Sequence, residues 1–373
     1  MMLAAVGYVG SDVAADAIVV ELAQREPESV RGSTQTTIYL VRTIFITISS
    51  ALTGFLFNGE EYGGTFDFSL TFPQLMIILV VCCVPAVPAT WFLIKEEKHP
   101  GVSFKNYIIE FWELLQSRAM YQVIFYIFIS GIFENVGTVT SSPIEEYWVG
   151  ATPLNDTIAS LIGNGLFAAV LYFTGKYGLQ WNWRWIHAIT LLATYAVDAV
   201  VMFLVIWDVA RSQWFWLGPP LVENLPQGVS FIVGTYVMVE LAGEGNEGAV
   251  YGLLTTVSNL ASTFASTITK NIDRNFDVSS DDIAEDTHHV RTQVTYVVLI
   301  SYLGGFIGLC FLPLLPAQKK ETQELKAKGG KSKLIGGFTV LYLTFSLCWS
   351  VMVNIMSIYP STSCYKFVGG DGC

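Results

Sequence analysis

Long apolar stretches separated by short polar segments run along the whole chain. A helix that crosses a bilayer needs about 20 mostly apolar residues, and these stretches lack the alternating pattern of a lipid-facing β-strand. The expected spans are residues 2–23, 36–57, 73–94, 120–140, 153–172, 186–206, 218–240, 250–268, 294–315 and 334–358. The pattern therefore predicts an all-α, polytopic transmembrane helical bundle with about ten membrane spans.

Composition narrows the class of protein further. Of the 373 residues, 52% are hydrophobic and 14% are charged, whereas a soluble domain carries roughly a quarter charged residues. The surplus of 31 Asp and Glu over 20 Lys and Arg excludes nucleic acid as a partner, because phosphates need a basic face. The sequence has no catalytic array, metal-ligand spacing or phosphate-binding glycine loop. We expect a multi-pass protein of the lipid bilayer that is not an enzyme and uses no cofactor or metal.

The basic residues predict the orientation of the chain. Most of the 20 Lys and Arg residues fall in the first, third, fifth and ninth connections between spans, and such loops stay in the cytoplasm. Both termini are then expected outside. The expected domains are a partial N-terminal bundle of three spans (1–94), a cytoplasmic linker with an amphipathic stretch (95–118), a C-terminal six-helix bundle (119–315), a basic cytoplasmic linker (316–333), and an extra transmembrane helix with a short extracytoplasmic tail (334–373).

The tetrapeptide VELA occurs twice, at residues 20–23 and 239–242. Each copy ends a span, precedes a short loop of acidic residues and glycine, and leads into a span rich in Thr and Ser. Internal repeats are typical of secondary transporters, in which two helical bundles move about a midplane site. Three further spans precede the second copy within its half, but only 19 residues precede the first. The repeat therefore predicts that the first half lacks three helices, through truncation or through an unusual arrangement of spans.

Ionisable residues inside the spans are the candidates for function, because each is unfavourable in hydrocarbon. Asp12 and Asp16 are four residues apart, so both carboxylates lie on one face of the first span. Two close acids in a low dielectric do not both ionise readily, which suits a proton-coupling site. The alternative is a buried pair neutralised by Arg42, the single intramembrane base, or by helix dipoles.

Other polar residues in the spans divide by position. One span is interrupted by Pro219, Pro220 and Pro226, and it contains Glu223, Asn224 and Gln227. Broken helices mark binding sites at the midplane of the membrane. Three others line the cavity in one interpretation and belong to helix packing in the other; these are Glu134, Asp198 and Asn259. His187 is expected at the membrane interface. A cytoplasmic gating or capping role is expected for Glu21, Arg31, Gly32, Glu240 and Glu247.

Residues 10–23, GSDVAADAIVVELA, followed by Arg31-Gly32 and Gln35, resemble the folate–biopterin transporter family of the major facilitator superfamily. The fourth helix of that family carries a similar acidic run before a cytoplasmic Arg-Gly, and residues 247–259 resemble its eleventh helix. The resemblance maps residues 1–315 onto helices four to twelve and makes 334–358 an additional span. The first three helices of the family have no counterpart here.

The resemblance implies uptake of a pteridine, folate or biopterin, in symport with protons. A pterin ring presents an amino group and a ring N–H that a carboxylate of Asp12, Asp16 or Glu223 could bind, and aromatic side chains could stack on its face. Arg42 would then pair with a substrate carboxylate, or with Asp16 at rest. Two alternatives stay open: a carrier of the same fold for another metabolite, and a truncated membrane protein that does not transport.

Overall fold

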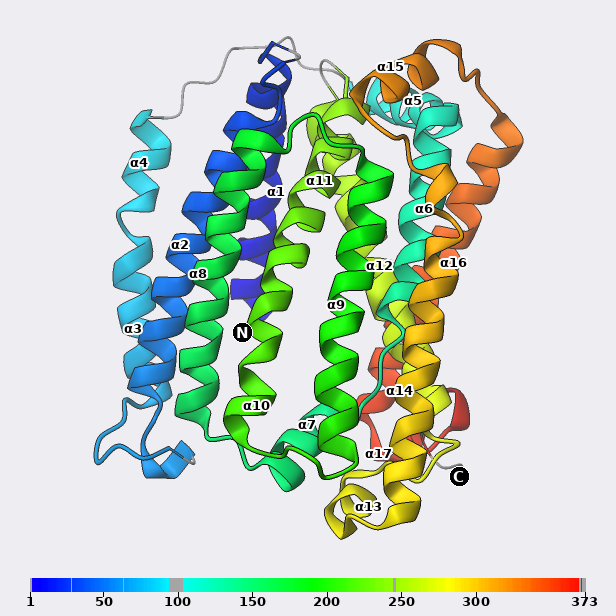
Figure 1. Ribbon diagram of the computed structural model, residues 1–373. Coiled ribbons are helices and arrows are strands. Elements are labelled where there is room, and N and C mark those ends of the chain that lie inside the picture. The colour runs from blue at the N-terminus through cyan, green and yellow to red at the C-terminus, as the bar shows by residue number, and fades with distance from the viewer. Residues whose placement is uncertain are drawn as a thin grey trace.

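The computed structural model describes residues 2–27, 29–62, 64–93, 103–243, 246–368 and 370. Long helices lie side by side and run roughly along one common direction (Figure 1). Within the described ranges, no strand occurs apart from two isolated bridges. The long helices are α1 (Met2–Gln24), α2 (Ser33–Leu56), α3 (Phe72–Cys83), α4 (Ala86–Leu93), α6 (Arg118–Asn135), α8 (Pro153–Tyr177), α9 (Trp183–Ile206), α11 (Asn224–Leu241), α12 (Glu247–Asp273), α14 (His288–Leu309) and α16 (Lys333–Ile358). The predicted all-α fold is confirmed.

Short elements close the two ends of the bundle. They are η1 (Glu60–Tyr62), α5 (Phe104–Gln116), α7 (Ser141–Pro143), η2 (Ile144–Val149), α10 (Gln213–Leu217), η3 (Pro219–Glu223), α13 (Ser280–Glu285), η4 (Leu312–Leu314), α15 (Lys319–Lys328), α17 (Pro360–Ser363) and η5 (Lys366–Val368). Figure 1 shows α5 and α15 at one end, and α7, α10, α13 and α17 at the other. The expected cytoplasmic connections thus gather at the end that carries α15, called the α15 end below.

Six helical segments are long and apolar enough to cross a membrane by length and composition: Ser33–Leu56, Phe72–Leu93, Pro153–Tyr177, Trp183–Ile206, His288–Leu314 and Lys333–Ile358. The other four expected spans form α1, α6, α11 and α12, which run beside these six. Three acids lie on α1, and α12 carries a series of Thr, Ser and Asn residues. The protein is therefore a multi-pass integral membrane protein.

Several expected boundaries need correction. The span expected at 73–94 is divided into α3 and α4 around Pro85, which lacks the N–H that a continuous helix needs. The span expected at 218–240 starts as the 3₁₀ turn η3 and becomes an α-helix only at Asn224. The span expected at 120–140 ends at Asn135. The helix expected from residue 294 begins at His288, because the Thr287 side chain caps it by accepting a hydrogen bond from a backbone N–H.

The expected basic linker at 316–333 is also more ordered than its composition suggested, because it contains α15. The amphipathic stretch expected in the linker before residue 118 forms α5, which lies at the same end of the bundle. Residues 94–102, which include the start of that expected linker, lie outside the described residues.

Small residues let α2 and α8 approach closely along their length. A Cβ added at Gly175 would lie 2.4 Å from Cγ2 of Thr36, and one added at Gly54 would lie 2.2 Å from Cγ2 of Thr157. Small residues facing a neighbouring helix are how membrane helices gain van der Waals contact without a hydrophobic driving force. The α2–α8 contact therefore joins the N-terminal helices to the six-helix segment that follows.

Candidate functional site

The first group of candidate residues lies where α1 faces α2. Asp12 and Asp16 are one turn apart on α1. Arg42 on α2 forms an ion pair with Asp12, with Nη2 and Oδ1 3.5 Å apart, and donates a hydrogen bond to the hydroxyl of Tyr8 at 3.1 Å. The side chains of Arg42 and Asp12 are 39% and 37% exposed, so both remain accessible beside each other.

Asp16 has a different partner. Tyr39 on α2 donates a hydrogen bond to Oδ1 of Asp16 at 3.4 Å, and its hydroxyl is also hydrogen-bonded to that of Tyr251 on α12. The Arg42 guanidinium lies 6.0 Å from the centre of the Tyr39 ring, at the limit of a cation–π contact. The ion pair of Arg42 is thus made with Asp12, and Asp16 is joined to α12 through two tyrosine hydroxyls.

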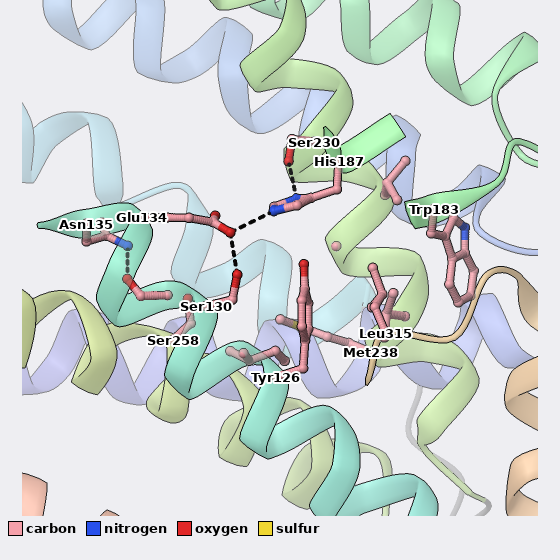
Figure 2. Close-up of a pocket in the computed structure, with 15 residues that line it drawn as sticks. Tyr126, Ser130, Glu134, Asn135, Trp183, His187, Ser230, Met238, Ser258 and Leu315 are labelled. Carbon is pink, nitrogen blue, oxygen red and sulfur yellow. Dashed lines mark hydrogen bonds and ion pairs between the residues drawn. The ribbon is translucent and has the colours of Figure 1, made fainter. Parts of the chain in front are cut away.

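A second group lines a cavity of about 230 Å³ among α6, α9, α11 and α12, which Figure 2 shows in close-up. Glu134 accepts a hydrogen bond from the hydroxyl of Ser130, one turn earlier on α6. The same carboxylate oxygen lies 3.0 Å from Nε2 of His187 on α9. The other ring nitrogen of His187 lies 3.4 Å from the hydroxyl of Ser230 on α11. One acid and one imidazole therefore meet at the junction of three helices.

Aromatic side chains close the same cavity. Tyr126 packs edge-on against the His187 ring, with centroids 6.1 Å apart, and its hydroxyl is directed toward His187 in Figure 2. Trp183 is fully buried, and its Nε1–H has no hydrogen-bond partner. A buried donor without an acceptor is rare, and the Trp183 ring lines the cavity.

The third group lies between α9, α14 and the start of α11. Asp198 accepts a hydrogen bond of 2.6 Å from the hydroxyl of Tyr302. Glu223 ends η3, and its Oε1 is buried without a hydrogen-bond partner. The amide of Asn224 donates to the carbonyl of Leu221 at 3.2 Å. Asp198 and Asn224 also line a separate cavity of about 350 Å³. The proline-interrupted segment thus contributes to a polar region distinct from the Glu134 cavity.

At the α15 end, Arg31 and Glu240 join the turn that follows the first VELA repeat to the second repeat. Nη1 of Arg31 lies 3.1 Å from Oε1 of Glu240, whose side chain is only 1% exposed. Gln323 on α15 donates to Oε2 of Glu240 at 2.6 Å, and Lys326 donates to the Glu240 carbonyl at 3.1 Å. Burial lowers the pKa of Lys326, although the charge of Glu240 opposes the shift. The buried carboxylate is therefore held by groups from two other segments.

The turn before α2 contacts α11 and α15 at the same place. Gly32 has a φ of +100°, and a Cβ there would lie 2.6 Å from a ring carbon of Tyr236. The Glu26 carboxylate accepts backbone N–H groups from Gly32, Ser33 and Thr34 at 2.8–3.1 Å, which completes the start of the helix. Lys319 on α15 donates to the Arg31 carbonyl at 2.8 Å. We name this set of contacts between the α1–α2 turn, the end of α11 and α15 the α15 lock.

Four candidate residues predicted from the sequence lie outside these groups: Glu21, Glu247, Gln227 and Asn259. Glu21 forms an ion pair with Arg25 one turn later. Glu247 is the first residue of α12, where an acid favours the helix dipole. Gln227 and Asn259 are exposed on α11 and α12.

Several residues of these groups were not predicted from the sequence. His187 was expected at the interface but contacts Glu134, and the tyrosines at positions 39 and 251 resembled ordinary aromatic residues of a membrane helix. Only the Ser130–Glu134 spacing of four residues, with Trp183 and His187 four apart on a second helix, could have indicated a shared face.

Comparison with known proteins assigns the family. The model of the BT1 family matches residues 1–333. A protein of Synechocystis sp. named "Folate-biopterin transporter" is 22% identical over 331 residues, which cover 85% of this chain and 62% of that protein. The chain thus spans less than two thirds of the length of this relative. No solved structure matches. Because the family model extends over nearly all of the described helices, from α1 to α15, the chain belongs to the BT1 family.

Proposed function

We propose that this chain carries a pteridine, folate or biopterin, across a membrane as a secondary transporter driven by protons. Membership of the BT1 family and the name of the Synechocystis relative support a pteridine as substrate. The proton-driven part rests on one network, which consists of Asp12, Asp16, Arg42, Tyr39 and Tyr251. Charged groups inside a membrane are energetically unfavourable, so those that occur there mark functional sites.

The two acids would have different tasks in this mechanism. Asp12 is neutralised by Arg42, whereas Asp16 is held by a tyrosine hydroxyl and is free to exchange a proton. Protonation of Asp16 would remove the charge that attracts the hydroxyl of Tyr39 and would weaken its link to Tyr251. The contact of α1 and α2 with α12 would then depend on the proton.

The α15 lock would be the closed gate of the cycle. In this proposal residues 1–94 and 119–315 are the two bundles of a major-facilitator-like carrier, with 95–118 and 316–333 as linkers and 334–373 as an added helix and tail. Arg31 and Glu240 hold the two bundles together at the α15 end, which is cytoplasmic by its charge. Opening toward the cytoplasm would require this buried pair to separate. Glu21 and Glu247 flank the same turns and would cap them.

The polar groups near η3 would serve the outer side of the pathway. Asp198 and Asn224 line a cavity there, and Glu223 has a buried oxygen without a partner. Gln227 lies on α11 and Asn259 on α12. These two side chains would meet substrate only if the helices rotate during the cycle.

The test is uptake of labelled biopterin and folate into proteoliposomes at external pH values between about 5 and 8. We expect uptake to fall as the external pH rises, because fewer coupling acids are protonated. Asp16→Asn and Arg42→Gln should reduce uptake and flatten this profile. Glu113→Gln, which changes an exposed acid on α5, is the matched control and should leave both unchanged. Uptake of neither compound by folded protein would refute pteridine transport, and a flat wild-type profile would refute proton coupling.

A further inference from the structure

The Glu134 cavity is not assigned a role by the family or by the relative, yet it has the features of a ligand site. It is concave, it lies among four helices, and it combines aromatic walls with a few convergent polar groups (Figure 2). Its polar centre is a carboxylate held by Ser130 and His187, and the rings of Tyr126 and Trp183 lie in its wall.

We infer that this cavity binds the bicyclic ring of an unconjugated pteridine through Glu134, and that it discriminates against folate. The inference rests on the proposed pteridine transport, although binding can be measured without transport. One edge of a pterin carries a ring N–H beside an amino group, and a carboxylate oxygen accepts hydrogen bonds from such donors.

The neighbours of Glu134 leave its carboxylate able to accept hydrogen bonds from a ligand. The Ser130 hydroxyl and Nε2 of His187 both contact the same carboxylate oxygen, Oε1. His187 is itself held from its other side by the hydroxyl of Ser230, so the imidazole is fixed while a ligand approaches the second carboxylate oxygen. The rings of Tyr126 and Trp183 supply flat apolar surface for a planar ligand.

Size and charge select against folate. A cavity of about 230 Å³ is smaller than the range of about 300–1,000 Å³ that is usual for drug-sized ligands, so it suits the bicyclic ring but not the ring with its aminobenzoyl-glutamate extension. The lining residues, all of which belong to the described part of the chain, include no Lys or Arg. The two carboxylates of folate would meet Glu134 without a Lys or Arg among these lining residues to pair with.

The experiment is equilibrium binding of labelled biopterin to the purified full-length protein in detergent, with folate and unlabelled biopterin as competitors. We expect folate to compete at least about tenfold less well than biopterin. Glu134→Gln should weaken biopterin binding at least about tenfold, because the amide replaces one acceptor with a donor. Glu113→Gln should not change it.

The outcomes separate this inference from the proposed function. Equal competition by folate and biopterin on the wild-type protein would overturn the discrimination without any variant that could misfold. Unchanged binding by a folded Glu134→Gln protein would overturn the assignment of the site. Binding that follows the expected pattern in a protein that shows no uptake in proteoliposomes would support the site and refute the transport function.

Discussion

The buried ion pair of the α15 lock makes an asymmetric prediction about stability. Glu240 is 1% exposed and Arg31 is 24% exposed. Removing one member of a buried pair typically costs about 3–5 kcal/mol, because the other charge stays buried without compensation. Arg31→Gln strands the carboxylate of Glu240 with Gln323 as its remaining side-chain partner, so we expect a loss near the lower limit, about 3 kcal/mol.

The converse change should be milder. Glu240→Gln leaves the guanidinium of Arg31, which can turn toward water, and keeps an acceptor for Gln323; a loss of about 1–2 kcal/mol is expected. The double variant has no stranded charge and should lose little more than Glu240→Gln alone. The interaction energy within the cycle is then just under about 3 kcal/mol.

The assay is equilibrium unfolding of the purified protein in mixed micelles titrated with a denaturing detergent, for the wild type, both single variants and the double variant. The control cycle uses Glu113 and Lys331, whose charged atoms are closer, at 2.8 Å, but whose side chains are 57% and 59% exposed. That exposed pair should show an interaction far smaller than that of the buried pair. Equal losses in Arg31→Gln and Glu240→Gln that simply add in the double variant would refute the reasoning.

Three further predictions follow from local geometry. Gly175→Val should destabilise the protein by about 1–3 kcal/mol in the same unfolding assay, because the new side chain meets Thr36 and overpacks the α2–α8 contact; an unchanged midpoint would contradict the close approach. Gly32→Ala should cost about 1–3 kcal/mol, because φ is +100° and the new Cβ falls 2.6 Å from an aromatic carbon; equal stability would show that the turn can relax. Although burial acts in the opposite direction, hydrogen bonds and charge from Arg211 and Arg291 lower the pKa of Asp286 to about 2, so its stabilisation is present above pH 4 and is lost as the pH falls toward 2. After allowance for a side chain that is 29% exposed, Arg211→Gln should remove about 1 kcal/mol at pH 7 and much less at pH 2, and a loss independent of pH would contradict this origin.

The sequence predicted the helices better than their contacts. Every expected span forms helix, because a run of about 20 apolar residues in a membrane has few other ways to satisfy its backbone. Helix ends were predicted less well, since Pro85 and the Thr287 cap act through local geometry that hydropathy does not record. The helix α15 was missed because its residues are polar on most sides, and its buried Lys319 donates to the Arg31 carbonyl, which is far away in the chain.

The candidate residues show the same limit. The spacing of Asp12 and Asp16 correctly placed both on one face of α1, because helix periodicity is local. That Arg42 would pair with Asp12, and that Asp16 would reach α12 through Tyr39, depended on how three helices pack. The contact between Glu134 and His187 joins residues 53 apart in sequence, and a single sequence contains no signal for such a pairing.

The most direct test of proton-driven pteridine transport is accumulation of labelled biopterin against its own gradient. Proteoliposomes that contain the purified chain would be given equal biopterin inside and outside, and the external solution would then be acidified. The account predicts that internal biopterin rises above the external concentration and returns to it when a protonophore collapses the gradient. Biopterin that stays equal on both sides, with or without the proton gradient, would contradict it.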